Sequence, residues 1–377
     1  MAKNKKQPLI KTKYSIGRNN EMIKRKAMSI AAFSAASMMT FSVSAAEVDG
    51  PEVNWNLSVW GKERAFTSSV ETIRDYVAEK TDGKFNIKIH YGEALSKARE
   101  NLDGIKLGAF QMAALCTAYH PAKNPTLSGL DLPFLPFPNL QVQTAVHEAY
   151  YKHPAVAEDM ARWDAMLLMS SLLPQYEFTG VGDPPLTLED WNGMRVRALG
   201  GIGEAMTKIG AVPTTVPAPE VYTSLERGTI EAASFPFTYA HVSYRLTDIG
   251  KWHTANMSPG ANHCPVVVNI PAYEALTPEY QQLLNDAKAP AYEALYAAYE
   301  AADAKNFPLM KEKGIQAITY SDEELARFRE IGAKPVWDEW VAKMNSDGYP
   351  GTELFELIMT TSKYPAGFGV TVGVRVI

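Results

Sequence analysis

The sequence contains only two cysteines, Cys116 and Cys264, and seven histidines among its 377 residues. It has no Cys-x-x-Cys pair and no His/Cys spacing that suits zinc, so a structural metal site is not expected. It also lacks Gly-x-Ser-x-Gly, His-Glu-x-x-His, a phosphate loop and a Gly-x-Gly-x-x-Gly after the first predicted strand. The run Gly200–Gly203 has the wrong spacing for that last motif. We therefore expect neither enzymatic activity nor a cofactor.

Long apolar runs are missing from the body of the chain, where none reaches the roughly 18–20 residues that span a bilayer. The N-terminus differs, because a basic cluster at 22–26 precedes the apolar run 27–43 and the small residues 43–46. This order predicts a secretory signal peptide over residues 1–46, with Met22 as the expected initiator, and hence a periplasmic protein. A single-helix membrane anchor is the alternative, but the run is short and ends in a cleavage-like site.

Basic residues are scarce beyond this leader. Nine of the 37 Lys and Arg but only one of the 42 Asp and Glu lie in residues 1–46, which leaves 28 basic and 41 acidic residues, a net charge of −13. Such a surface repels nucleic acid and anionic lipid, so no nucleic-acid partner is expected. A bound anion would need a local cluster of donors.

The two cysteines leave two alternatives open. In an oxidising compartment Cys116 and Cys264 could pair. Both also lie in apolar, strand-like runs, where a cysteine behaves as a small buried hydrophobe. We favour unpaired core thiols.

Alternating apolar residues predict strands over 53–60, 85–89 and 112–116, and residues at helical spacing predict helices between them. Buried strands that alternate with helices indicate a βαβαβ unit with a parallel sheet. The run 165–173 is expected to cross to a second lobe, and the strand 264–270 to return to the first.

Helix-capping signals follow. Thr277 before Pro278 predicts the start of a helix that extends past Glu300 along both lobes, with a kink or break at Pro290. Ser321 to Glu324 predicts a capping box. The predicted fold is α/β, a two-lobed periplasmic-binding-protein-like fold with hinge-crossing strands and a long helix spanning both lobes. Its expected boundaries are lobe I at 47–171 plus about 262–290, lobe II at 172–261 plus about 291–345, and a C-terminal helix and tail at 346–377.

The segment 190–203 is the richest in chemistry. It is read as an acidic turn, a short strand through Arg195 and Arg197, and glycines that open a helix over 204–209. A helix N-terminus presents free N–H groups, and an arginine beside it adds a planar fork that matches a carboxylate. Arg197, nearest the glycines, is the candidate anchor of an organic-anion site; the alternative is a surface strand with two solvated arginines.

Six segments in order resemble the DctP-type solute-binding proteins of tripartite ATP-independent periplasmic (TRAP) transporters, over essentially all of residues 53–345. They are YGEAL (91–95) with GAFQM (108–112), LPFL (132–135), LEDWNGMRVR (188–197), GAVP (210–213) and EVYTSLERGTIE (220–231).

The resemblance implies that Arg197 binds the carboxylate of a ligand and that Arg195 does not. Some members have a second arginine about 20 residues before the anchor, where this chain has Glu177. Some have an asparagine where this chain has Phe235. Both departures favour an acid with an apolar or aromatic body over a hydroxylated sugar acid.

Other positions complete the predicted substrate site. Trp60 and Tyr119 end strands of the first lobe and could form facing walls, although core or loop packing would explain them equally. Asn269 matches a family position near the hinge, where it would either donate to the ligand or bond backbone. Glu220 is expected to cap its helix or contact the other lobe.

The predicted function is capture of an organic acid by lobe closure and its delivery to the small and large membrane subunits of a TRAP transporter, with the receptor a monomer. The alternative is a sensory ectodomain that binds the same acid without transport. A cation-assisted site, with Glu177 or Glu231 as ligands, is a further alternative.

Overall fold

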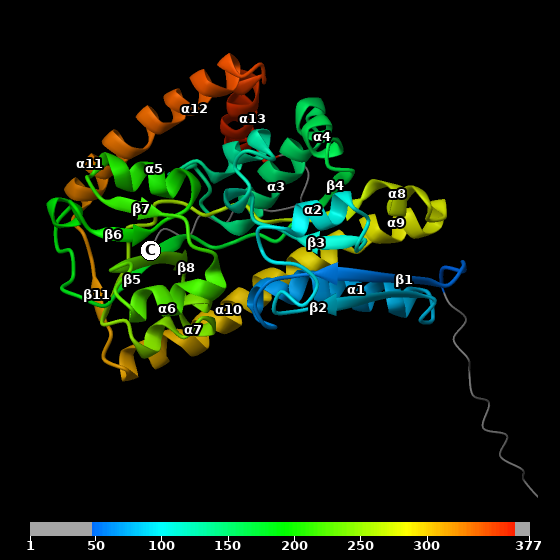
Figure 1. Cartoon of the computed structure of the whole chain (residues 1–377), viewed down its shortest axis with the longest axis horizontal. Coiled ribbons are helices and arrows are strands. Elements are labelled where there is room, and N and C mark those ends of the chain that lie inside the picture. Colours follow the sequence, from blue (N-terminus) through cyan, green and yellow to red (C-terminus); the bar gives the residue numbers. More distant parts are fainter. Residues whose placement is uncertain (1–46, 366–377) are drawn as a thin grey trace, which may run out of the picture. The chain divides into compact units, whose positions relative to one another are not determined.

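The computed structural model describes residues 47–365. The predicted signal peptide, with its membrane-anchor alternative, and the tail beyond residue 365 lie outside this range. Within the range the chain forms two sheets flanked by helices (Figure 1). No helix among these residues has the length and apolarity needed to cross a membrane.

The first sheet has the strand order β2-β1-β3-β10-β4. Its strands are β1 (Val53–Ser58), β2 (Phe85–His90), β3 (Met112–Ala114), β4 (Ala165–Ser170) and β10 (Pro265–Asn269). The pairs β1/β2 and β1/β3 are parallel, which confirms the βαβαβ unit. Strand β10 also lies in this sheet, as predicted, but it runs antiparallel to both of its neighbours, so the sheet is mixed.

The second sheet has the order β11-β9-β5-β8-β6-β7. Its strands are β5 (Tyr176–Gly180), β6 (Arg195–Arg197), β7 (Val212–Thr214), β8 (Ala232–Pro236), β9 (Trp252–Thr254) and β11 (Gln316–Ile318). Strand β6 lies between β7 and β8 and is parallel to both. Its neighbour β8 pairs antiparallel with β5. The carboxyl ends of β6 and β8 therefore open on the same edge.

Helices cover both sheets. Those that pack beside the first sheet are α1 (Ser68–Lys80), α2 (Asn101–Lys106), α3 (Leu140–Tyr151), α4 (Pro154–Ala161), α8 (Ile270–Glu274) and α9 (Pro278–Asp286). Those that pack beside the second sheet are α5 (Gly200–Lys208), α6 (Val221–Glu226), α7 (Tyr239–Ser243) and α11 (Asp322–Gly332). Helix α5 begins at Gly200, four residues before the predicted start, because Gly200 itself takes up the positive φ that opens it.

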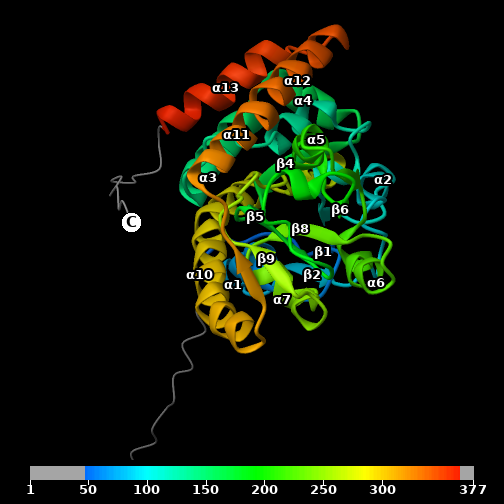
Figure 2. The ribbon, with the colours of Figure 1, turned by 90° about the vertical axis from the view of Figure 1, so that its left-hand side faces the viewer.

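The chain crosses between the sheets at 171–175, directly after β4 and at the end of the run 165–173 that was predicted to cross, and again at 255–264. Helix α10 (Lys288–Glu312) packs against both α1 and α7, so it extends along both halves (Figures 1 and 2). Its Tyr299 hydroxyl donates to the carbonyl of Leu172 in the first crossing segment, at 2.6 Å. The helix is interrupted, but at Ala287, between α9 and α10, and not at Pro290 as predicted. Pro290 lies in the first turn of α10.

Both predicted caps are present. The Thr277 side chain accepts from the backbone of Tyr280 and opens α9. The Ser321 side chain accepts from the backbone of Glu324 and opens α11. The Glu324 carboxylate does not complete the box, because it accepts instead from the backbone N–H of Leu188 at 3.1 Å.

Two helices near the C-terminus, α12 (Lys334–Ser346) and α13 (Gly351–Lys363), belong to an apolar cluster that lies around α3 and the loop at 125–135. The Trp337 indole donates to the carbonyl of Pro133, at 2.7 Å. Residues 334–345, which the predicted boundary assigned to lobe II, therefore contact the first-sheet side as well as α5, where Lys208 pairs with Glu339 of α12 at 2.5 Å. The sequence did not reveal this because an amphipathic helix does not specify which face it covers.

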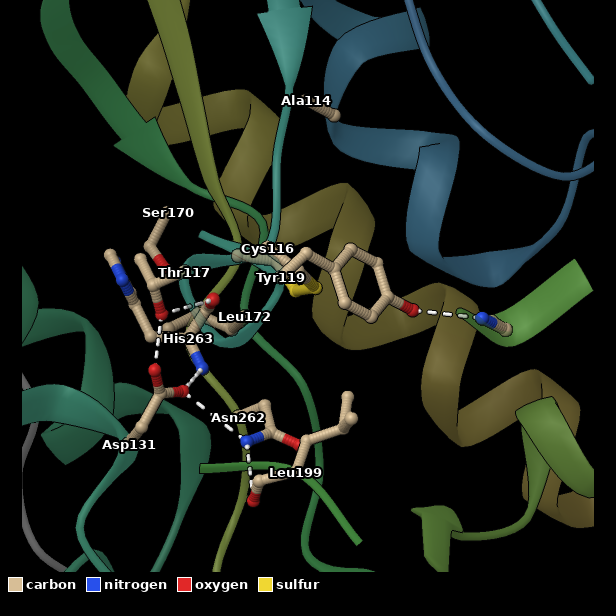
Figure 3. The surroundings of a disulfide bond; sticks show 12 residues. Ala114, Cys116, Thr117, Tyr119, Asp131, Ser170, Leu172, Leu199, Asn262 and His263 are labelled. Atoms are coloured by element: carbon tan, nitrogen blue, oxygen red, sulfur yellow. Dashed lines mark hydrogen bonds between the residues drawn. A yellow bond between two sulfur atoms is a disulfide. The ribbon is translucent and has the colours of Figure 1, made fainter. Parts of the chain in front are cut away.

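Cys116 and Cys264 form a disulfide with a Cα separation of 4.1 Å, so the expectation of unpaired thiols is wrong (Figure 3). Cys116 follows β3 and Cys264 precedes β10, and these strands are antiparallel neighbours in which Ala114 pairs with Val266. Continuing that register by two residues places the cysteines opposite one another. The sequence alone could not give this register, because 148 residues separate the two positions.

Candidate functional site

Arg197 ends the short strand β6, and its side chain is only 2% exposed. Its Nη1 donates to the carbonyl of Ser234 at 2.7 Å, and its Nε to the carbonyl of Val216 at 3.0 Å. Its Nη2 makes a longer contact of 3.4 Å with the Tyr119 hydroxyl. These bonds hold the guanidinium plane while leaving donors free, since the group carries five N–H bonds.

No carboxylate of residues 47–365 lies within 4 Å of Arg197. A buried charge without a counter-charge is costly, and proteins normally pair it or use it. Neutral carbonyl oxygens fix the direction of the side chain but do not cancel its charge. The site is therefore electrostatically suited to an anion.

Aromatic rings surround the guanidinium. Its central carbon lies 4.4 Å from the centroid of the Phe235 ring. The Tyr119 hydroxyl also accepts from the backbone N–H of Ala218 at 2.9 Å, which ties the end of the first sheet to the second. The ring of Trp60 stands edge-on to Tyr119 with centroids 6.0 Å apart. Four of the predicted site residues thus line one cavity: Arg197, Phe235, Trp60 and Tyr119.

Sequence reasoning missed several residues of this cavity, namely Arg64, Tyr176, Tyr239 and Tyr244. Arg64 lies four residues beyond Trp60, in the turn that leaves the first strand, and that position is the signal that could have identified it. Burial raises the pKa of Tyr176 and of Tyr244 above the usual value, so both phenols remain neutral. Among the residues that the structure describes, Arg64 and Arg197 are consequently the only charged side chains in the lining.

The cavity has a volume of about 20 Å³, close to the space of one water molecule. Its walls come from both sheets. A further contact joins them outside the cavity, where Arg99 Nη2 donates to the carbonyl of Thr215 at 2.9 Å. The two halves are therefore in direct contact around the cavity.

Arg195, two residues before the anchor on the same strand, has a different environment. It is exposed, bonds the carbonyls of Gly228 and Thr229, and lies 3.5 Å from the Glu231 carboxylate. It takes no part in the cavity lining. Glu220, at the start of α6, is exposed and makes no capping bond.

Glu177 does not contribute to the cavity, contrary to its place in the predicted site. Its carboxylate accepts from Thr254 and from the backbone of Met257, at 3.2 Å for the latter, and from the backbone and side chain of Ser258, each at 2.9 Å. Burial raises the pKa of Glu177, and these bonds oppose the shift. Its oxygens are engaged in holding the second crossing segment.

Asn269 is also misplaced in the predicted site. It ends β10 and caps α8, because its Oδ1 accepts from the backbone of Ala272 at 3.0 Å and its Nδ2 donates to the carbonyl of Ile105 at 2.9 Å. It lies at the end of β10 that points away from Cys264, so it is remote from the cavity. Its backbone-bonding alternative is the one the structure supports.

A larger groove of about 940 Å³ adjoins the cavity, lined by the loop at 117–132, the start of α5 and the end of α12. It contains the carboxyl groups of Asp131, Glu204 and Asp347 and one lysine, Lys343, which is already paired with Asp347. Burial raises the pKa of Asp131 to about 7, and its carboxylate accepts from the backbone of His263 at 2.6 Å (Figure 3). The groove also holds the N-terminus of α5, but its carboxyl groups outnumber its one lysine, whereas the small cavity is lined by arginine side chains and by no carboxyl group of residues 47–365.

The cation-assisted alternative finds little support in geometry. Glu231 is bonded to the backbone N–H of Arg195 at 2.9 Å and does not line the cavity. Across residues 47–365, no three His, Cys, Asp or Glu side chains converge as metal ligands would.

Two α/β halves joined by crossing segments, with a cavity between them that is lined by Arg197, define the class of two-lobed solute-binding proteins. The chain belongs to the bacterial extracellular solute-binding protein family 7, known as DctP, whose profile matches residues 58–344. The TRAP-type resemblance inferred from the sequence is thereby confirmed.

Individual relatives are distant in sequence. A monocarboxylate 2-oxoacid-binding periplasmic protein of a Nostoc species is 22% identical over 86% of this chain and 93% of its own length. A C4-dicarboxylate-binding periplasmic protein of Rhodobacter capsulatus is 24% identical over 72% of this chain and 81% of its own. A crystal structure of a marine metagenome TRAP solute-binding protein specific for aromatic acids, with 3-hydroxybenzoate, is similar at a TM-score of 0.75 and 21% identity, covering 84% of this chain and all of the other.

Proposed function

We propose that this protein is an extracytoplasmic receptor that captures an organic acid through Arg197 and presents it to TRAP membrane subunits. The observation that carries the proposal is the buried guanidinium of Arg197, held by neutral carbonyls and lacking a counter-charge within the described chain. A ligand carboxylate would supply that charge and would accept two parallel N–H bonds.

Flat aromatic walls favour an acid with an apolar or aromatic body. Phe235 and Trp60 offer ring faces or edges, and the cavity lining contains no amide side chain that would recognise sugar hydroxyls. The relatives' ligands are acids of several kinds, and one structural relative is specific for aromatic acids. These comparisons support the general class of ligand.

Capture requires opening. A space of about 20 Å³ cannot admit an organic acid, for which pockets are typically about 300–1,000 Å³. The halves would separate by breaking contacts such as Tyr119 with Ala218 and Arg99 with Thr215, while the crossing segments and α10 act as hinges. Closure over the bound acid would then restore these contacts.

Export, the monomeric state and the absence of catalysis belong to the same proposal. The segment 1–46 would direct the chain to the periplasm and be removed there, and the receptor would act as a monomer that releases its ligand unchanged. N-terminal sequencing of exported protein checks the cleavage, since a mature chain beginning near Glu47 is expected.

The test is a thermal-shift screen of the exported protein against monocarboxylates, dicarboxylates, aromatic acids and sugar acids. A ligand present at about 100 times its Kd should stabilise the native state by about 2.7 kcal/mol, which is readily measured. Stabilisation by acids with an apolar or aromatic body, and not by their amides, is the expected result. Silence across all acids, or equal stabilisation by the amides, would contradict the proposal.

A further inference from the structure

Two arginines, and no acidic residue, line the same small cavity. Arg197 is the proposed anchor for one carboxylate. Arg64 belongs to the other half of the protein, where it precedes a short helical turn at Ala65–Thr67. A ligand can bind Arg64 only if the hydrogen bonds within the protein leave part of its guanidinium free.

The fold uses only one nitrogen of the Arg64 guanidinium. Its Nη1 donates to the carbonyls of Trp60 and Lys62, at 2.9 and 2.7 Å. Its Nε is buried and has no hydrogen-bond partner within the described chain. The Nε and Nη2 edge, which pairs side-on with a carboxylate, therefore remains free of bonds from residues 47–365.

No acidic side chain neutralises Arg64 within the described chain, since no carboxylate there lies within 4 Å of it. Arg64 also lines an outer hollow together with Glu63 and Glu71, and the Glu71 carboxylate accepts from the Tyr91 hydroxyl at 2.7 Å. The Tyr244 hydroxyl is a second buried polar atom at this end of the cavity for which residues 47–365 supply no hydrogen-bond partner. It lies near the Arg64 Nη1, as the position of Gly61 shows. A Cβ atom placed on Gly61 would lie 2.9 Å from the Tyr244 hydroxyl oxygen and 2.9 Å from the Arg64 Nη1.

Aromatic rings separate the two arginines along one wall. The guanidinium of Arg197 lies 4.4 Å from the Phe235 centroid, and that ring is 5.3 Å from the ring of Tyr244. The Tyr244 centroid is in turn 5.7 Å from the guanidinium carbon of Arg64.

The opposite wall repeats this arrangement. The guanidinium of Arg64 lies 5.7 Å from the Trp60 ring, and the Trp60 and Tyr119 centroids are 6.0 Å apart. The Tyr119 hydroxyl then contacts Arg197 at 3.4 Å. Two chains of contacts thus connect the arginines, one through Phe235 and Tyr244 and the other through Trp60 and Tyr119.

We infer that Arg64 forms a second anion subsite and that the ligand is a dicarboxylate whose two acid groups are separated by a flat or apolar body. This inference rests on the proposed function, since it places a second contact on the same ligand. One carboxylate would pair with Arg197, and the other with the free edge of Arg64 and the Tyr244 hydroxyl. Because the arginines come from different halves, such a ligand would also hold the halves together.

Matched pairs of acids test this inference by isothermal titration calorimetry. The probes are benzoate with terephthalate and hexanoate with adipate, each pair sharing a body and differing by one carboxylate. The proteins are the wild type, Arg64→Gln, Arg64→Lys and Arg197→Gln. Arg74→Gln is the control, because Arg74 is a surface residue of α1 that is paired with its neighbour Asp75.

The wild type should bind at least one diacid about tenfold or more tightly than its monoacid partner, as for a well-formed charge pair. Arg64→Gln should remove this preference, lowering diacid affinity about tenfold or more and monoacid affinity less than about threefold. Arg64→Lys should retain part of the preference, and Arg74→Gln should retain all of it. A purely structural Arg64 would instead weaken both members of a pair equally.

The outcomes separate the two proposals. If monoacids bind as well as diacids, or if Arg64→Gln weakens both alike while Arg197→Gln abolishes binding, the second subsite is wrong and the receptor function stands. If no acid binds the wild type, or if Arg197→Gln binds normally, the proposed function itself is overturned. Circular dichroism and melting curves of each variant establish that it is folded.

Discussion

Arg197 and Glu177 are both buried charged residues of the second sheet, on strands that flank β8, and each is 2% exposed. Glu177 is surrounded by donors from the chain itself, which bind both of its oxygens. Arg197 is held by neutral acceptors, and no carboxylate of the described chain lies within 4 Å of it. The difference shows that burial of a charge does not by itself indicate function. What matters is whether other residues of the chain supply the hydrogen-bond partners and the counter-charge that the buried group needs.

Arg197→Gln should have the largest effect on binding. Removing one partner of a buried, hydrogen-bonded charge pair costs about 2–5 kcal/mol, so affinity for an acid should fall by roughly 30-fold to several-thousand-fold. The free energy of unfolding should change little, because the wild-type protein without ligand already bears an unpaired buried charge. Calorimetric titration and urea unfolding measure the two quantities separately.

Arg195→Gln is the matched control on the same strand. Its exposed contact with Glu231 is of a kind worth about 0–1 kcal/mol, and it does not touch the cavity. We expect near-normal affinity. Equal losses in the two variants would show that Arg197 is not the anchor.

Glu177→Gln should have the opposite profile. One carboxylate oxygen becomes an N–H donor that faces donors from Met257 or Ser258, and a buried group left unsatisfied costs about 1–3 kcal/mol. Urea unfolding should record this loss while affinity for the acid changes less than about threefold. If affinity fell as strongly as in Arg197→Gln, Glu177 would have a role in ligand binding and the distinction between the two residues would be wrong.

Lowering the pH should decrease the free energy of unfolding before it decreases the affinity for the ligand. Burial lowers the pKa of His120 to about 4, and of His147 and His241 to about 3. In the unfolded chain these histidines become protonated below about pH 6.5, whereas in the folded protein they stay neutral until about pH 3–4. The free energy of unfolding is therefore unaffected by them above about pH 6.5 and decreases progressively as the pH falls toward about 3–4. At pH 5.5 each histidine should cost about 1 kcal/mol.

Unfolding measured between pH 5 and 8 checks this expectation, with His147→Gln giving a flatter curve below pH 6.5. Asp131 acts in the opposite direction: its pKa is raised to about 7, so its contribution is lost as the pH rises, and Asp131→Asn removes it. Affinity for the acid should stay nearly constant between pH 6 and 8, because arginines do not titrate there. An affinity that followed the stability curve would place a histidine in the binding step.

Sequence-based predictions were correct where the structure depends on residues close together in the chain, and wrong where it depends on contacts between distant segments. The parallel unit β1, β2 and β3 and the caps at Thr277 and Ser321 were predicted, because alternation and capping depend on neighbours a few residues apart. The antiparallel direction of β10 and the packing of α12 were not, since they depend on which distant surface each element meets.

The site divided in the same way. Arg197, Phe235, Trp60 and Tyr119 were predicted as ligand-binding residues, and the structure places them around one cavity. Glu177 and Asn269 were proposed from positions in the family pattern, yet their side chains bond the protein itself.

The sequence by itself determined the two-lobed α/β architecture, the family and the anchor candidate, because strand periodicity, helix signals and one strand–glycine segment are local properties. Only the tertiary structure decided that Cys116 meets Cys264 and that Arg64 faces the cavity that holds Arg197. The register of β3 with β10 sets the first contact, and the approach of the two halves sets the second. Both join residues more than 130 positions apart, where no local pattern specifies the partner.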